Sequence, residues 1–255
     1  MNKRNTQQRR HLIVAQLQQQ GELSVEQLAE QFHTSEVTIR KDLTVLEQAG
    51  LLLRRYGGAL PVPQDFVSDS SLEKVSNRKL AIAKAAASLI KDHYRIIIDS
   101  GRTTAALLPE LATKRGLVVM TNSLAIANTL RELENEPTLL MTGGTWDPQS
   151  EAFQGQLAEQ MLRNYDFDQL FIGADGIDLA RGTTTYNELY SLSRVMAEVA
   201  REVIVMLESD KLGRKIHNLE LPWSMVKVLI TDEGLAAADA AQIEQQGVKV
   251  IRVAG

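Results

Sequence analysis

Short apolar segments that alternate with helical patterns constrain the fold of this chain more than any other feature of its sequence. The apolar segments occupy residues 95–99, 117–121, 138–144, 169–175, 202–207, 226–232 and 248–255. Between them, apolar residues recur at helical spacing over residues 79–90, 103–112, 123–133, 157–164, 191–200 and 237–246. Segments that alternate in this way predict the α/β class, a largely parallel sheet covered by helices.

Small polar residues follow five of the apolar segments. They form the loops "DSGRTT" (99–104), "TNS" (121–123), "TGG" (142–144), "GADGID" (173–178) and "ESDKLGR" (208–214). Ligands of open α/β sheets bind at the carboxyl ends of the strands, so these loops are expected to converge on one pocket. Thr103 and Thr104 offer hydroxyl donors, and backbone N–H groups near Gly101 can face an anion. Because Lys211 and Arg214 add positive charge, this chemistry fits a phosphorylated metabolite.

The first sixty residues predict a separate bundle of three short helices. Gly21 ends the first helix, Ser24 and Gln27 have the spacing of a capping box at the start of the second, and Ser35 caps the third. The residues expected to face inward are Leu12, Ile13, Leu17, Val25, Leu28, Phe32, Ile39, Leu43 and Leu46. The tight turn before Ser35 makes the second and third helices a helix-turn-helix.

The third helix and the segment after it carry the side chains suited to DNA. A recognition helix places its N-terminal residues at base edges in the major groove, while arginine and lysine neutralise phosphates. In "LLLRRYGGALP" a short strand, two arginines and a Gly-Gly turn predict a wing. The outward or wing residues are Glu36, Thr38, Arg40, Lys41, Arg54 and Arg55. The same features also suit an ordinary bundle with a solvated face, but the whole series favours DNA binding.

Charge and composition agree with an N-terminal DNA-binding domain attached to a second domain of a different kind. Residues 1–57 carry eight Lys/Arg against six Asp/Glu, whereas the whole chain of 255 residues has a net charge of −4. The chain has no cysteine, which removes disulfides and thiolate zinc sites. Its apolar runs are too short to cross a bilayer and its basic start lacks an apolar leader segment, so we expect a cytoplasmic protein. The prolines and serines of residues 61–77 predict a linker.

These segments resemble one protein family. "SEVTIRKDLTVLEQAG" followed by "RRYGGA", and then "IDSG-x-TT", "MTNS", "TGG", "GADGID" and "SDKLGRK", stand in the order found in DeoR-type bacterial sugar-metabolism repressors. Within this family, the sequence of these segments is most similar to repressors of hexitol and amino-sugar operons, such as the glucitol operon repressor. The resemblance implies a winged helix-turn-helix over residues 1–60, a linker over 61–77, and a ribose-5-phosphate isomerase-like effector domain over 78–255.

The resemblance also implies partners and site residues. The partners are double-stranded operator DNA, a phosphorylated sugar or hexitol that releases the protein from that DNA, and further copies of the chain in a homo-oligomer. Ser35, Thr38, Arg40 and Lys41 inherit the DNA-contacting role by position. The implied effector site consists of Asp99, Ser100, Gly101, Arg102, Thr103, Thr104, Asn122, Ser123, Gly144, Asp175, Glu188 and Lys211.

Three departures from the family pattern concern this effector site. Arg102 stands where the family has Thr or Ser, the segment around Trp146 lacks the family's basic residues, and Asp210 adds a carboxylate beside Lys211. One hypothesis is that Arg102 replaces the charge lost near Trp146; the alternative is a solvent-facing residue. We expect Trp146 itself to pack in the core.

The kinship with isomerases makes an enzyme the main alternative. Aldose–ketose isomerisation needs a positioned base and a group that polarises the carbonyl. Asp175 matches the isomerase pattern, but Arg181 stands in place of its lysine, and Glu188 does not fall on the position of its catalytic carboxylate. The sequence therefore predicts no catalytic residues, and no cofactor or metal, since its four histidines lack ligand spacing. A third possibility is an architectural DNA-binding oligomer without an effector.

Overall fold

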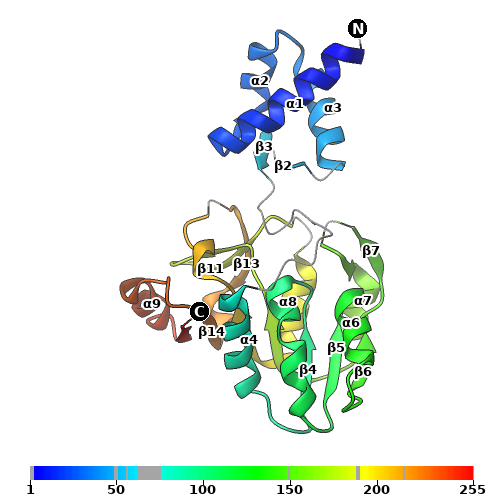
Figure 1. Cartoon of the computed structure of the whole chain (residues 1–255), viewed down its shortest axis with the longest axis vertical. Coiled ribbons are helices and arrows are strands. Elements are labelled where there is room, and N and C mark those ends of the chain that lie inside the picture. Colours follow the sequence, from blue (N-terminus) through cyan, green and yellow to red (C-terminus); the bar gives the residue numbers. More distant parts are fainter. Residues whose placement is uncertain are drawn as a thin grey trace. The chain divides into compact units, whose positions relative to one another are not determined.

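The computed structural model describes residues 3–48, 51–55, 57–61, 76–148, 150–187, 190–214 and 216–254 (Figure 1). The chain divides into two compact units, Met1–Glu73 and Lys74–Gly255, and each has its own hydrophobic core. Residues 62–75, most of the expected linker, lie outside the described residues. At the two ends of that linker, Pro61 closes a strand and Asn77 opens a helix.

The first unit is a winged helix-turn-helix, as predicted. Its helices are α1 (Lys3–Gln20), α2 (Val25–Gln31) and α3 (Glu36–Gln48). A small antiparallel sheet in the order β1–β3–β2 completes it, with strands β1 (Leu23–Ser24), β2 (Leu52–Arg55) and β3 (Gly58–Pro61). Strands β2 and β3 form the wing.

Local capping explains where these helices begin and end. Ser24 and Gln27 form the predicted capping box, and the Ser35 hydroxyl accepts a hydrogen bond from Thr38 N at 3.2 Å. Gly21, with a φ of +76°, follows the end of α1. The expectation for Leu12 is wrong, because this side chain is 49% exposed. The buried face of α1 is centred on Ile13, and Leu12 lies about 100° around the helix from it.

The second unit contains a fully parallel seven-stranded sheet, which confirms the predicted α/β class. Its strand order is β15–β14–β12–β9–β4–β5–β6. The strands are β4 (Arg95–Ile98), β5 (Val118–Thr121), β6 (Thr138–Met141), β9 (Phe167–Ile172), β12 (Ala200–Met206), β14 (Val228–Asp232) and β15 (Lys249–Val253). The chain reverses its direction across the sheet between β4 and β9, the kind of point where such sheets bind ligands.

Helices cover both faces of this sheet and bury its alternating side chains. Ile96 and Ile98 of β4 pack in one core cluster and Ile97 in the other. The first face is covered by α4 (Asn77–Ser88), α5 (Arg102–Ala105), the 3₁₀ helix Leu108–Thr113 and α6 (Leu124–Arg131). The second is covered by α7 (Gln156–Leu162), α8 (Ser191–Glu198) and α9 (Ala237–Glu244).

Three local features differ from the sequence prediction. The helix expected over 103–112 is divided into α5 and the 3₁₀ helix, with Pro109 near the start of the latter. A hairpin of β7 (Thr145–Asp147) and β8 (Ala152–Gln154) follows β6, and it leaves Trp146 42% exposed against Phe153, so the expected core position of Trp146 is wrong.

A second small sheet lies where the sequence predicted only loops. The strands β10 (Gly176–Asp178), β11 (Gly182–Thr185) and β13 (Asn218–Pro222) pair in an antiparallel sheet (Figure 1). Part of the expected "GADGID" loop is therefore strand. Within the described ranges, none of the helices is both long and apolar enough to cross a membrane.

Candidate functional site

The predicted DNA-reading residues of α3 lie on its surface. Glu36, Arg40 and Lys41 are exposed and Thr38 is half-buried. Arg40 forms an ion pair with Glu36 at 2.7 Å, with both side chains more than half exposed. An exposed pair of this kind contributes little stability, so the guanidinium can exchange its partner for a DNA phosphate at small cost.

The two wing arginines also contact carboxylates. Arg54 donates to Thr44 Oγ1 at 2.8 Å and lies 3.7 Å from Glu47, which ties the wing to α3. Arg55 forms an ion pair with Glu22. The two arginines that the sequence predicts to contact DNA therefore tie the wing to α3 and to the segment before β1.

Asp42 is a structural residue that the sequence analysis missed. Its carboxylate, on the inner side of α3 and only 2% exposed, receives Arg9 at 2.6 Å and Arg10 at 2.7 Å from α1. Two charge-assisted bonds to a buried carboxylate fix α3 against α1. The one sequence signal was that position 42 lies among the inward positions 39, 43 and 46 of the same helix.

In the second unit, the loops after β4 and β5 are joined by hydrogen bonds. Asn122 Nδ2 donates to Asp99 Oδ1 at 2.7 Å, and Ser100 N donates to Asn122 Oδ1 at 2.9 Å. Thr103, Thr104 and Asn122 are buried. The structure thus brings together the expected effector residues of these two strand ends.

A second group of expected residues lies at the ends of β9 and β12. Lys211 Nζ donates to Ala174 O at 2.7 Å, and Arg214 donates to Asp175 O at 3.2 Å. The Asp175 carboxylate accepts hydrogen bonds from Thr185 Oγ1 at 2.9 Å and Tyr186 N at 3.0 Å. Two cations and a fixed carboxylate therefore meet at this edge of the sheet.

Buried carboxylates link the two groups. Burial, with a smaller contribution from the nearby Asp175, raises the pKa of Asp99 to about 6, against the lowering effect of the hydrogen bonds from Asn122 and Ser100. Burial also raises the pKa of Asp175, against the lowering effect of Lys211 and Arg214. The sequence analysis missed Glu220 on β13, whose pKa is raised to about 8 by burial and by Asp175. Nothing in its local pattern marks this glutamate, because its burial depends on the small antiparallel sheet.

Other expected effector residues have local structural roles. The Thr104 hydroxyl donates to Gly101 O at 2.9 Å, and Ser123 Oγ caps α6 by accepting from Ile126 N at 3.4 Å. At Gly144, with a φ of +109°, an added Cβ would lie 2.4 Å from Gln154 O, so its glycine serves the packing of the hairpin. Arg102 is exposed. Glu188 lies outside the described residues.

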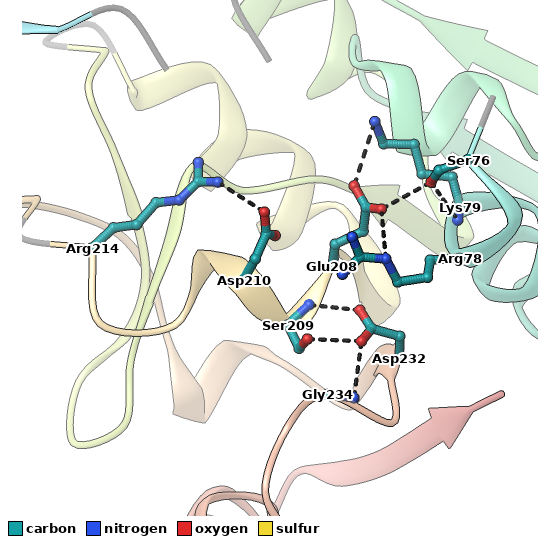
Figure 2. Close-up of polar contacts among 9 residues, drawn as sticks. All are labelled: Ser76, Arg78, Lys79, Glu208, Ser209, Asp210, Arg214, Asp232 and Gly234. Atoms are coloured by element: carbon teal, nitrogen blue, oxygen red, sulfur yellow. Dashed lines mark hydrogen bonds and ion pairs between the residues drawn. The ribbon is translucent and has the colours of Figure 1, made fainter. Parts of the chain in front are cut away.

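The loop after β12 contacts several neighbouring elements (Figure 2). Ser209 binds the Asp232 carboxylate through its N at 2.8 Å and through its hydroxyl at 2.7 Å. Asp210, the carboxylate that departs from the family pattern, forms an ion pair with Arg214 at 3.5 Å. Asp210 thus lowers the positive charge near Lys211 through Arg214. No cluster of three or more potential metal ligands occurs among the described residues.

Comparison with known proteins identifies both units. The family description "DeoR-like helix-turn-helix domain" matches residues 9–64, and "DeoR C terminal sensor domain" matches residues 74–233. The chain belongs to the DeoR family. The DeoR sensor match includes every expected effector residue, and the DeoR helix-turn-helix match includes every expected DNA contact. The protein is therefore a DNA-binding transcriptional regulator with a sensor domain.

Relatives in the DeoR family match nearly the whole chain. A protein of Escherichia coli O157:H7 that bears the name of an aga operon transcriptional repressor is 40% identical, over 97% of this chain and 94% of the relative. The transcriptional repressor AccR of Agrobacterium fabrum is 33% identical, over 90% and 91%. These relatives are named as regulators and not as enzymes, in agreement with the prediction that the chain is no enzyme.

Solved structures show a more distant likeness. The ribose 5-phosphate isomerase A of Methanocaldococcus jannaschii is 21% identical over 54% of this chain and 54% of the isomerase, with a TM-score of 0.39. A probable sor operon regulator from Shigella flexneri is 11% identical over 68% of this chain and 89% of that chain, with a TM-score of 0.43.

Proposed function

We propose that this DeoR-family protein represses a sugar or sugar-alcohol catabolic operon and is released from its operator by a phosphorylated sugar or hexitol. The observation that carries the proposal is the grouping at the carboxyl edge of the sheet, where Lys211 and the loop after β4 lie near the buried Asp99 and Asp175. This edge is where open α/β sheets bind ligands.

The groups at this edge suit the two ends of a sugar phosphate. The Lys211 ammonium supplies positive charge for a phosphate, and the Thr103 hydroxyl and the backbone N–H groups of residues 101–104 supply hydrogen-bond donors. Asp99 and Asp175 supply acceptors for sugar hydroxyls. Arg102, exposed at the start of α5, adds a second charge for the phosphate.

The first unit binds the operator through α3 and the wing. Arg40 and Lys41 neutralise phosphates, and the exposed first turn of α3 reads base edges. Operators with two-fold symmetry pair with two reading heads, so the active form is a homo-oligomer. The effector shifts the protein toward a state with lower DNA affinity, which requires that it bind the two states differently.

Fluorescence anisotropy on DNA from upstream of the protein's own operon tests the proposal. The titrants are glucitol 6-phosphate, glucose 6-phosphate, glucosamine 6-phosphate and ribose 5-phosphate. Release of the DNA by one of these compounds is the expected result. If the protein binds the DNA but none of the compounds releases it, the result supports the architectural alternative. If the protein converts one of the compounds, the result supports an isomerase.

A double substitution tests the DNA-binding surface. Arg40→Ala with Lys41→Ala removes two charges, so we expect at least about a tenfold loss of operator affinity and a salt dependence weaker by about two released counterions. Arg201→Ala with Lys227→Ala, two exposed positions of the second unit, is the matched control. Unchanged affinity in the α3 variant would contradict the assignment.

A further inference from the structure

Glu208 begins the 208–214 loop and lies between the expected effector site and the start of α4, but it is not among the residues expected to bind the effector. Its side chain is only 8% exposed. Three side chains from the start of α4 surround the carboxylate (Figure 2). Ser76 Oγ donates to Glu208 Oε1 at 2.9 Å, Arg78 Nε lies 3.6 Å from Oε1, and Lys79 Nζ lies 3.4 Å from Oε2.

The same contacts fix the first turn of α4. Ser76 is the N-cap of this helix, and its hydroxyl accepts a hydrogen bond from Lys79 N at 3.2 Å while donating to Glu208. Ser76 is also the first described residue after the segment that connects the two units. Glu208 therefore contacts the residue at which the described part of the sensor unit begins.

On its other side, Glu208 is bonded to the residue expected to meet the effector phosphate. Lys211 N donates to Glu208 O at 3.2 Å, while Lys211 Nζ reaches Ala174 O at the end of β9. Between them, Ser209 is held by its two bonds to Asp232 (Figure 2). The short 3₁₀ turn Ser209–Lys211 thus has a fixed point at Asp232, with the effector site on one side and α4 on the other.

We propose that Glu208 is a positioning residue that carries effector occupancy from Lys211 to the first turn of α4, and from there to the connecting segment. The inference rests on the proposed function. When an anion draws Lys211 from Ala174 O, the turn moves about Ser209 and the Glu208 carboxylate changes its contacts with Ser76, Arg78 and Lys79. Loss of all its partners would leave a buried charge uncompensated, so the Glu208 carboxylate exchanges one set of contacts for another.

A purely structural Glu208 would behave differently. If its contacts with α4 were equal in the DNA-bound and released states, its removal would lower stability without changing the coupling between effector and DNA. The coupling factor, which is the ratio of the DNA dissociation constants with and without effector, therefore distinguishes the two roles.

The test uses the full chain, its operator DNA and the sugar phosphate from the four-compound panel that releases the wild type. Glu208→Gln keeps an acceptor for Ser76 but removes the charge that faces Arg78 and Lys79. Effector affinity without DNA, measured by calorimetry, and DNA affinity without effector are expected to stay within about twofold of the wild type. Allosteric coupling is commonly about 5- to 150-fold, and we expect it to fall at least about fivefold, or to no coupling at all.

Two further variants complete the experiment. Ser76→Ala removes the hydrogen bond to Glu208 but leaves the Glu208 carboxylate near Arg78 and Lys79. This variant keeps the test decisive if Glu208→Gln does not fold. We expect it to lose coupling as well. Glu198→Gln alters a surface ion pair with Arg163 and is the matched control, expected to couple like the wild type.

The outcomes separate two failures. A wild type that responds to an effector, with a Glu208→Gln or Ser76→Ala variant of unchanged coupling, overturns the role of Glu208 and leaves the proposed function standing. A wild type that no compound of the panel releases overturns the proposed function, and the role of Glu208 with it.

Discussion

At the scale of single residues, buried carboxylates dominate the electrostatics of the sensor unit. Asp99, Asp175 and Glu220 come from three different elements, and burial raises the pKa of each. Burial and mutual repulsion raise the free energy of ionising carboxyls that lie near one another, so these groups retain protons at pH values where exposed carboxyls have lost them. This edge of the sheet is therefore sensitive to pH and to substitutions that add charge.

Glu220→Gln is expected to change the pH dependence of stability. The folded-state pKa of Glu220 is about 8 against an ordinary 4.5, so its contribution is full below about pH 4.5 and is lost as the pH rises through 8. The raised pKa values of Asp99 and Asp175 have the same sign. One pKa unit corresponds to about 1.4 kcal/mol. As the pH rises from 5 to 8, the unfolding free energy of the wild type should therefore fall by on the order of 3 kcal/mol more than that of the variant.

Urea unfolding at pH 5, 6.5 and 8 measures this difference. Glu233→Gln, at an exposed position, is the control and should follow the wild type. Parallel pH profiles for the wild type and Glu220→Gln would show that Glu220 does not retain its proton in the folded state.

Asn122→Asp is expected to weaken effector binding. The new carboxylate would replace an amide nitrogen that lies 2.7 Å from Asp99 Oδ1, so the two acids must share a proton or repel each other. We expect at least about a tenfold loss of affinity at pH 8 and a smaller loss at pH 6, where the pair holds its shared proton. Calorimetry with the releasing compound measures it, and Asn128→Asp on the exposed side of α6 is the control. Equal losses at both pH values would contradict this account.

At the scale of elements, the ion pairs of Asp42 with α1 add to the apolar packing that positions α3. Asp42 binds Arg9 and Arg10 of α1, whereas the face of α3 that we propose to contact DNA carries the exposed pair of Arg40 and Glu36. The recognition helix is therefore fixed from its inner side, which leaves its outer side free to change partners on binding DNA.

Asp42→Ala is expected to destabilise the first unit by about 2–4 kcal/mol, because it leaves two arginines without their buried partner, one of them partly exposed. Glu36→Ala breaks an exposed pair and should cost less than about 1 kcal/mol. Calorimetric unfolding of the full chain should show the transition of the first unit lowered and that of the second unchanged. Similar shifts for the two variants would contradict an anchoring role.

At the scale of the whole molecule, a basic head and an acidic sensor unit share one chain. Residues 1–57 carry a net charge of +2 and the remainder carries −6, which opposes binding of the second unit to nucleic acid, so we expect the contacts with DNA in the first unit. A single head offers few phosphate and base contacts, which is the physical reason to propose that two or more heads act together.

Sedimentation of the free protein and of its operator complex tests the proposed homo-oligomer. We expect a mass of two or more times 28.3 kDa. We also expect an operator with inverted half-sites whose centres lie about 10.5 base pairs, or a multiple of that, apart. Deleting one half-site should weaken binding far more than twofold. A protein that sediments as a monomer both free and on its operator would contradict the proposal.

The sequence by itself determined the features that depend on local pattern. The alternation of strands and helices, the caps at Ser24 and Ser35 and the wing follow from periodicity and short-range hydrogen bonding, and the structure confirms them. The carboxyl-end loops could also be placed at one edge, because parallel strands share their direction. The predictions that Leu12 and Trp146 are buried were wrong, because the direction of an apolar side chain depends on what its element packs against.

Only the tertiary structure decided which distant residues meet. Asp42 pairs with Arg9 across 33 positions, and Ser76 binds Glu208 across 132. The burial of Glu220 depends on an antiparallel sheet formed by segments whose sequence suggests loops. Periodicity describes one element at a time, whereas contacts between elements depend on strand order and packing, which no local pattern contains.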